Sequence, residues 1–332
     1  MERETGFQPV PNIPQEALLH ELARIAGECS EGRAITGIRV EPFRFAASYA
    51  AHVASVTFGN GTELRLFVKD FSTSRLVKDA RAARRQRERR VYADLLGRLG
   101  LGTARYHGCS WDEVHGRYWL FLELVEGELL RRQAFPRWHE TAAWLGRMQS
   151  TLAREPHIPH DVLPPLDRHH FEGVAERALM VVRDAAPALS DRLERALQNR
   201  SRTLDLMTAG PLCMVHGSFR PDNILVATSS SPPRICPVDW ELAALGNPLF
   251  DLAYLCDGFT GWRLDQLVDA FQRHVGSHVT LPPPPPLHET LRAFQVHKML
   301  SSLGKEKNRH RTAEVMATVV QRIELLSAGN AA

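Results

Sequence analysis

The sequence predicts an α+β protein with two lobes, a small β-rich N-terminal lobe and a larger, mostly helical C-terminal lobe. A chain of 332 residues exceeds one ordinary hydrophobic core, so two lobes are expected. The N-terminal part contains a strong hairpin signal, Gly59-Asn60-Gly61, between two apolar runs. Most of the C-terminal part has apolar residues at helical spacing. Hydrophobic residues make up 44% and charged residues 24% of the chain, which is ordinary for a globular protein.

The elements of the N-terminal lobe follow from apolar spacing and from turn signals. We expect residues 1–13 to form a loose arm. Helices are predicted at residues 14–26 and from about residue 74 to residue 99, and strands at residues 35–40, 52–58, 63–69 and 118–125. The 52–58 and 63–69 strands form the arms of the hairpin, and the second of them ends at Lys69.

The C-terminal lobe is predicted to consist mainly of helices. Helical spacing is found at residues 138–152, 171–206 with a break at Pro187, 264–275, 288–303 and 313–326. Between two of these segments, the run from Pro282 to Pro286 predicts a stiff, extended connector.

Positive charge is concentrated in one segment. Residues 75–90 contain eight Lys or Arg residues against Asp79 and Glu88, a net charge of +6, whereas the whole chain carries +3. A basic run of this kind could bind nucleic acid, anionic lipid or an anionic partner. The simpler interpretation is the solvated face of a helix, so we do not expect a nucleic-acid partner.

Membrane segments and disulfides are not expected. No apolar run reaches transmembrane length, and the N-terminus has no apolar signal segment. The five cysteines form no C-x-x-C pair, which favours reduced thiols. We therefore expect a cytoplasmic protein without a membrane partner. Its oligomeric state is not determined by the sequence.

Polar residues stand at the ends of three short apolar runs between residues 212 and 255. The first run ends at His216-Gly217, Asn223 opens the second, and Asp239 ends the third. Polar side chains at strand ends, held by a buried backbone, are a common way to present catalytic groups. Asn223 and Asp239 offer hard oxygen ligands of the kind that Mg²⁺ takes when it carries nucleotide phosphates.

A second candidate site involves Glu88. This residue falls on the apolar face of the predicted 74–99 helix, together with Val91 and Tyr92. A carboxylate on an inward face needs a partner, because burying it alone is costly. Lys69, at the end of its strand, is the natural candidate. The alternative is an exposed Glu88 beside Arg84 or Arg85.

The stretch from residue 212 to residue 255 also carries a specific set of motifs. It contains H-G, an Asn, D-W-E and G-N-P-x-x-D-L-A in this order, at His216, Gly217, Asn223, Asp239, Trp240, Glu241, Gly246, Asn247, Pro248, Asp251, Leu252 and Ala253. With these residues it resembles the catalytic core of the aminoglycoside phosphotransferase and choline kinase family, which is related to the protein kinases. The resemblance implies a bilobal, protein-kinase-like fold with an N-lobe at residues 1–122, a hinge at 123–127 and a C-lobe at 128–332, in which residues 212–255 form the catalytic-type loop.

The same resemblance implies cofactors and roles for individual residues. The expected cofactors are ATP or GTP and Mg²⁺, with Asn223 and Asp239 as the metal ligands. The nucleotide is expected at Lys69, Glu88, Ser48 and the hinge residues Glu123 and Val125, although residues 118–125 could also be an ordinary strand. His216 belongs to the catalytic loop, and Asp251 is expected to be structural, bracing this loop near the histidine.

Two departures from the family limit what the resemblance implies. The family's catalytic Asp falls on Ser218, and a hydroxyl is not a base near neutral pH unless another group activates it. Asp222 lies nearby and could replace the base, or it could face solvent. In addition, no glycine occurs between Gly37 and Gly59, where a loop over the phosphates is expected, so Ser48 is the remaining candidate contact there.

Three functional hypotheses therefore stand. The first is a phosphotransferase that acts on a hydroxyl of a small molecule. The second is a pseudokinase that binds or scaffolds without efficient transfer. The third is the same fold reused for other chemistry, with Ser218 as a polar contact or a nucleophile. Lys69, Glu88, Asn223 and Asp239 favour nucleotide binding, whereas Ser218 favours the second and third hypotheses. The sequence does not determine the acceptor.

Overall fold

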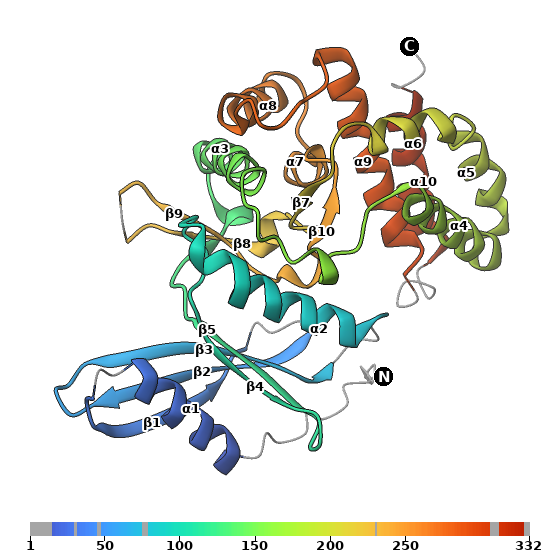
Figure 1. Ribbon diagram of the computed structural model, residues 1–332. Helices are drawn as coiled ribbons and strands as arrows, with labels where there is room; N and C mark the ends of the chain where they lie inside the picture. The colour runs from blue at the N-terminus through green and yellow to red at the C-terminus, as the bar shows by residue number, and fades with distance from the viewer. Residues whose placement is uncertain are drawn as a thin grey trace. The chain divides into compact units, whose positions relative to one another are not determined.

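The computed structural model describes residues 15–29, 32–44, 48–74, 79–229, 231–305 and 312–328. It divides into two compact units (Figure 1). Unit 1 comprises Met1–Gly127 and Ala227–Val238, and unit 2 comprises Glu128–Val226 and Asp239–Ala332. Unit 1 is built around a β-sheet and unit 2 is mostly helical, which confirms the predicted α+β class. The predicted loose arm at residues 1–13 lies outside the described residues.

Unit 1 is organised around one antiparallel sheet of five strands in the order β1-β2-β3-β5-β4. The strands are β1 (Ile35–Pro42), β2 (Tyr49–Phe58), β3 (Glu63–Ser74), β4 (Tyr106–Asp112) and β5 (Arg117–Glu123). The predicted hairpin is confirmed between β2 and β3. Its turn is closed by Asn60, whose Oδ1 accepts hydrogen bonds from the amide and the hydroxyl of Thr62 at 3.1 and 2.7 Å.

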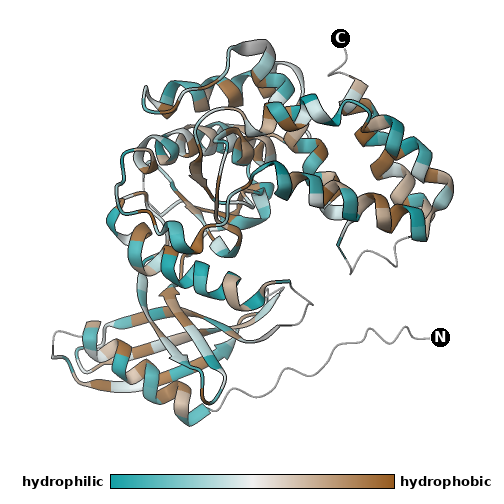
Figure 2. Ribbon diagram, turned by 45° about the vertical axis from the view of Figure 1, so that its right-hand side comes forward, coloured by the Kyte–Doolittle hydropathy of each residue, from teal (hydrophilic) through white to brown (hydrophobic). Residues whose placement is uncertain are grey.

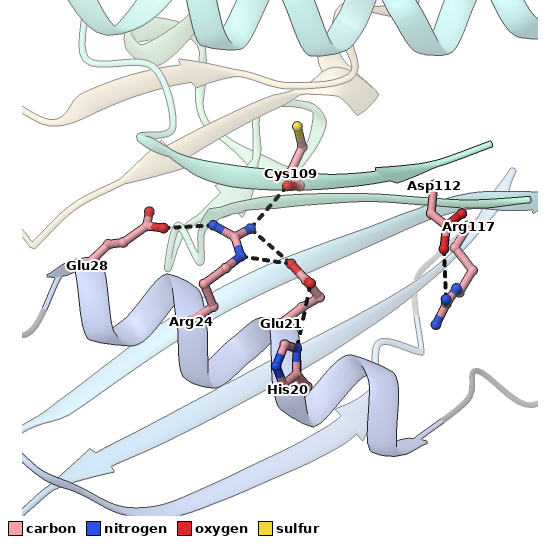
Figure 3. A network of polar contacts seen from close by, with 7 residues as sticks. All are labelled: His20, Glu21, Arg24, Glu28, Cys109, Asp112 and Arg117. Atoms are coloured by element: carbon pink, nitrogen blue, oxygen red, sulfur yellow. Dashed lines mark hydrogen bonds and ion pairs between the residues drawn. The ribbon is translucent and has the colours of Figure 1, made fainter. Parts of the chain in front are cut away.

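Helix α1 (Gln15–Cys29) packs on one face of this sheet. Its Leu22 and Ile25 form a buried cluster with Leu66 and Val68 of β3. Arg24 on the same helix donates to the carbonyl of Cys109 at 3.3 Å and pairs with Glu21 and Glu28 (Figure 3). Because side chains alternate along a strand, Phe67 and Lys69 point to the opposite face of β3.

Within the described residues, the basic side chains of the run lie on helix α2 (Arg81–Arg90) and make contacts within unit 1. The guanidinium of Arg85 lies 3.4 Å from the ring centroid of Tyr118, and that of Arg89 lies 5.3 Å from the ring of Trp111. Arg84 pairs with Asp79, and Arg90 pairs with Asp94. The two cation–π contacts hold α2 against β4 and β5, and the two ion pairs join it to the adjoining chain, so this is not a purely solvated face.

The predicted 74–99 helix is shorter and less regular than expected. Strand β3 continues to Ser74, and α2 begins at Arg81. After α2, the chain forms a wider π-turn at Val91–Leu95 and then a tighter 3₁₀ turn at Leu96–Arg98. Residues 75–78 lie outside the described part of the chain.

Unit 2 contains eight helices among its described residues: α3 (Phe135–Leu152), α4 (Arg168–Ala185), α5 (Ser190–Ala196), α6 (Arg200–Thr208), α7 (Leu249–Leu255), α8 (Gly261–Val275), α9 (Pro284–Leu303) and α10 (Ala313–Ala328). Hydrophilic and hydrophobic residues alternate along them, as in amphipathic helices (Figure 2). Ala178, Leu303 and Val320 belong to a core cluster built by α4, α9 and α10. None of the helices in the described ranges is long and apolar enough to cross a membrane.

One local prediction in unit 2 was wrong, and another was incomplete. The proline run at residues 282–286 is not an extended connector throughout, because α9 begins at Pro284. Prolines fit the first turn of a helix, where their missing N–H groups have no intrahelical partner to lose. The 171–206 segment breaks twice, at the 3₁₀ turn Pro187–Leu189 and again between α5 and α6.

Short strand pairs position the central stretch. Strand β7 (Cys213–Val215) pairs with β10 (Ala244–Gly246), and β8 (Ile224–Ala227) pairs with β6 (Glu128–Leu129). A further short strand, β9 (Arg234–Pro237), belongs to unit 1. The first two predicted apolar runs are therefore strands, and the loop from His216 to Asn223 connects them.

Candidate active site

In unit 1, Lys69 and Glu88 form a buried ion pair. The Nζ of Lys69 lies 2.8 and 2.7 Å from the two carboxylate oxygens of Glu88, and Glu88 is only 1% exposed. The ammonium also lies 5.1 Å from the ring of Phe71 and 5.5 Å from the ring of Tyr49. The predicted pairing is confirmed, and the alternative of an exposed Glu88 beside Arg84 or Arg85 is wrong. Glu88 holds the ammonium in one orientation on the sheet face opposite α1.

The predicted phosphate loop is only partly described, because residues 45–47 lie outside the described residues. At its ends, Phe43 packs edge-to-face on Phe67 with ring centroids 5.2 Å apart, and Ser48 is partly buried just before β2. Phe67 therefore occupies the strand face that also carries Lys69, as the alternation predicts. A phosphate contact by Ser48 stays a prediction.

The predicted hinge begins where β5 ends. The amide of Glu123 donates to the carbonyl of Arg105 at 2.8 Å, so this amide is already used within the sheet. Both carboxylate oxygens of Glu123 accept hydrogen bonds from Arg234, at 2.6 and 2.8 Å. These bonds hold the pKa of the Glu123 carboxyl below its usual value. A base contact at Glu123 would thus have to use its carbonyl, and the contact at Val125 stays a prediction.

Arg234 was not identified from the sequence. It also donates to the carbonyls of Gly102 and Thr103, at 2.7 and 2.8 Å, and so ties β9 to the strand that enters the hinge. An Arg within an otherwise apolar strand was the only available signal, and it does not reveal a partner more than a hundred residues away.

In unit 2, Asp251 braces the loop that begins at His216. Its carboxylate is fully buried and accepts hydrogen bonds from the amides of His216 and Gly217, at 2.6 and 3.1 Å. Burial raises the pKa of Asp251 to about 7, against the opposing effect of the two amide bonds. The predicted brace is confirmed. At the start of α7, Asn247 Oδ1 accepts a hydrogen bond from the amide of Leu249.

Gly217 is required at its position for two reasons. Its φ of +77° lies in the left-handed region, which favours glycine. A Cβ built on it would lie 1.9 Å from the carbonyl oxygen of Leu242, which is backbone and cannot turn away. The loop therefore passes very close to the segment that follows Asp239.

Ser218, at the position of the family's catalytic Asp, is 6% exposed and engaged in hydrogen bonds. The Nδ2 of Asn223 donates to the carbonyl oxygen of Ser218 at 3.0 Å and to its Oγ at 3.2 Å. The amide of Ser218 donates to Nδ1 of His216 at 3.3 Å. The His216 ring is fully buried and packs on Trp240 with centroids 4.4 Å apart. The structure thus brings His216, Ser218 and Asn223 together.

Asp222 lies in the same loop and is paired elsewhere. Its Oδ1 lies 3.0 Å from Nε of Arg131, and both side chains are about half exposed, at 50% and 53%. This ion pair involves a partner that the sequence did not single out. The carboxylate is therefore held by a cation at the surface, an arrangement closer to the predicted solvent-facing alternative than to a replacement base.

Asp239 follows β9 with φ 68° and ψ 60°, a left-handed conformation that is costly for a non-glycine residue. A carboxylate oxygen of Asp239 and one of Glu241 lie within 4.8 Å of each other. Because Nδ2 of Asn223 points to Ser218, its Oδ1 is the atom available to a cation. The neighbouring carboxylates of Asp239 and Glu241 offer oxygen donors, which suit Mg²⁺, and an Mg²⁺ contact by Asn223 stays a prediction.

Comparisons with known proteins agree with this geometry. A family model described as the phosphotransferase enzyme family matches residues 45–294. No curated protein matches the chain in sequence.

Solved structures match in fold at low sequence identity. The GDP and kanamycin complex of APH(2")-IIia shares 16% identity at a TM-score of 0.59, over 94% of this chain and 98% of that chain. A choline kinase from Cryptosporidium parvum Iowa II shares 14% at a TM-score of 0.59, over 94% and 95% of the two chains. A macrolide 2'-phosphotransferase, MphH from Brachybacterium faecium, shares 17% at a TM-score of 0.56, over 95% and 96%. With the family model spanning most of its length, this chain belongs to the phosphotransferase enzyme family.

Proposed function

We propose that the protein transfers a phosphoryl group from a Mg²⁺-bound nucleotide, ATP or GTP, to a hydroxyl of a small molecule, with a weakened base at Ser218. The observation that carries this proposal is the buried Lys69–Glu88 ion pair, 2.7 Å in length. A buried ion pair contributes little to stability compared with apolar residues of the same size, so its presence calls for another reason. A cation held rigidly for phosphate oxygens is such a reason.

The residues have separate roles in this proposal. Glu88 fixes the Lys69 ammonium where it can contact phosphate oxygens, and Val125 with the carbonyl of Glu123 would contact the base. Asn223 and Asp239 would hold Mg²⁺. When bound, the Mg²⁺-nucleotide supplies the transferable phosphoryl group and neutralises part of its charge.

The residue at position 218 sets the rate of phosphoryl transfer in this proposal, because it stands where a general base is expected. Its hydroxyl can hydrogen-bond an acceptor hydroxyl, but it does not take a proton near neutral pH. Loss of general-base help costs typically about 10²–10⁴-fold. Turnover would then rest on positioning and on charge neutralisation, which Lys69 and the metal ligands provide.

Support for a small-molecule acceptor comes from the similar proteins. They are a kanamycin complex, a macrolide 2'-phosphotransferase and a choline kinase. The small molecules in these names differ from one another, so they support a small-molecule acceptor in general and not one particular compound.

A nucleotide-binding pseudokinase is the second candidate, and Ser218 itself favours it. Its Oγ accepts a hydrogen bond from Asn223, so the residue works as part of the loop's framework. The third hypothesis, a serine nucleophile, has less support, because Nδ1 of His216 accepts from the Ser218 amide and is not available to activate the hydroxyl.

The test compares wild type with Ser218→Asp and Ser218→Ala. Calorimetry with MgCl₂ should show binding of ATP or GTP that changes little among the three, because residue 218 faces the acceptor. Ser218→Asp should raise phosphoryl transfer or nucleotide hydrolysis by up to about 10²–10⁴-fold. Absence of nucleotide binding in all three would remove both the phosphotransferase and the nucleotide-binding pseudokinase. An activity that Ser218→Ala abolishes and Ser218→Asp does not support would point to a serine-specific reaction.

A further inference from the structure

Unit 2 contains a cavity that the proposed reaction does not use. Its volume is about 270 Å³, and it lies among α4, α5, α6, α9 and α10. No residue of the 212–255 stretch lines it. Ligand pockets of small molecules usually span roughly 300–1,000 Å³, so this one could hold only a small ligand.

The inner wall of the cavity is apolar. Phe171 of α4, Leu204 and Met207 of α6, and Leu300 of α9 line it, and each is at most 5% exposed. Such a wall fits an aromatic ring or a short hydrocarbon body.

One polar side chain interrupts this wall. His297 on α9 lines the cavity and is only 4% exposed. Its ring makes contacts with Phe171 at 4.9 Å, His170 at 5.8 Å and Phe250 at 5.9 Å between centroids. Neither ring nitrogen forms a hydrogen bond with any residue that the structure describes. Burial lowers the pKa of His297 to about 3, so the imidazole is neutral and offers one donor and one acceptor.

A deeply buried imidazole needs a hydrogen-bond partner, and the partner left to His297 is a group inside the cavity that it lines. A leucine or phenylalanine would fill the same space at lower cost. The position of His297 therefore indicates that something in the cavity completes its hydrogen bonding.

The opening of the cavity is cationic. Arg195 and Arg200 line it and are exposed, and their side chains form no ion pair within the described ranges. The nearby Glu324 is occupied by Arg192, whose guanidinium donates to both its carboxylate oxygens at 2.9 and 2.6 Å. Arg195 also lies close enough to Glu324 to help lower the pKa of that carboxyl, so Arg200 is the more available of the two arginines to an anion.

From these features we infer that the cavity binds a small organic acid. The apolar body would lie against Phe171 and Met207, a hydroxyl or carbonyl group at the inner end would bond His297, and the carboxylate would face Arg195 and Arg200. No residue that has a role in the proposed reaction lines this cavity, so its occupancy can be tested without that reaction.

Three related probes test each part of the inference in the absence of nucleotide and Mg²⁺. They are 4-hydroxyphenylacetate, phenylacetate without the hydroxyl, and 4-hydroxyphenethyl alcohol without the charge. Calorimetry should show the tightest binding for 4-hydroxyphenylacetate and at least about tenfold weaker binding for the other two, as expected when one hydrogen bond or charge contact is lost.

Variants then assign the contacts. His297→Phe should bind 4-hydroxyphenylacetate no better than phenylacetate and should melt at the same or a higher temperature than wild type. Arg200→Gln should weaken both acids, whereas Arg202→Gln, on the same helix but paired with Glu289 at 2.7 Å, should leave binding unchanged. The inference is overturned if none of the probes binds at millimolar concentration, if the alcohol binds as well as the acid, or if His297→Phe keeps full affinity.

Discussion

The two units each bury a carboxylate, and they stabilise it in different ways. Glu88 in unit 1 is 1% exposed and meets the ammonium of Lys69. Asp251 in unit 2 is fully buried and meets two backbone amides, those of His216 and Gly217. The first arrangement fixes the position of a charged side chain. The second fixes the course of the chain.

This difference matters for a family member with an altered base. Lys69 is held by the first kind of contact, and the loop around Ser218 is held by the second. A substitution at residue 218 leaves both kinds of contact in place. The geometry of the site can therefore persist with a serine at residue 218.

The largest loss of folding stability is expected at Gly217, whose amide bonds Asp251 and whose backbone lies close to the Leu242 carbonyl. Gly217→Ala needs a left-handed Ala and brings a Cβ to 1.9 Å from the Leu242 carbonyl. We expect urea denaturation to show a loss above about 4 kcal/mol, or no folded protein. The control is Gly210→Ala, which has φ +84° but no atom within 4 Å of the new Cβ. It should cost only about 1–2 kcal/mol. Equal costs would show that the close approach is unimportant.

Removal of the brace itself should come next. Asp251→Ala leaves two buried amides without acceptors, at about 1–3 kcal/mol for each. Thermal and urea unfolding of purified protein measure this cost. A melting temperature equal to that of wild type would contradict the assignment of Asp251 as the brace of the loop.

The same residue predicts a pH dependence. The folded pKa of about 7 lies above the ordinary value of 3.8. Between these pH values the folded protein holds a proton on Asp251 that the unfolded chain has released. The contribution of this proton to the free energy of unfolding is therefore full below about pH 4 and is lost as the pH rises toward 7, by at most about 1.4 kcal/mol per pH unit. Asp251→Asn should thus cost more at pH 5 than at pH 8. The opposite trend would mean that the two amide bonds outweigh burial.

The ion pair of unit 1 should respond differently from the brace. Lys69→Met leaves Glu88 buried without its cation and should destabilise unit 1 by about 3 kcal/mol, the lower end for buried pairs, because the lysine side chain is 11% exposed. The double variant Lys69→Met/Glu88→Leu should recover most of this loss while still failing to bind nucleotide. If the double variant were as unstable as the single one, the pair would be serving the fold rather than a ligand.

The sequence predicted those contacts that follow from a short motif or from the spacing of apolar residues. Asn60 between glycines identified the hairpin, and the position of Glu88 on an apolar helix face required a cation such as Lys69. Strand β4 was missed because it is an edge strand whose residues are all partly buried, so it lacks apolar alternation. The partners of Arg234 and of Asp222 were missed because each pair joins segments far apart in the chain, and no spacing rule connects them.

The smallest effect is expected at the surface of the catalytic-type loop, where Asp222 pairs with Arg131. Both side chains are about half exposed, so Arg131→Gln should change the free energy of unfolding by less than about 1 kcal/mol. The variant also releases Asp222, which makes it a sensitive test of the replacement base. If Asp222 accepts the proton in place of Ser218, its release should alter turnover, and Asp222→Asn should reduce it by about 10²–10⁴-fold. We expect neither change, because Oδ1 of Asp222 is directed to Arg131 at 3.0 Å, whereas the contacts of Ser218 are made by His216 and Asn223. Steady-state transfer rates of both variants, measured beside Ser218→Asp, check this expectation, and a large loss in Asp222→Asn alone would identify Asp222 as the base.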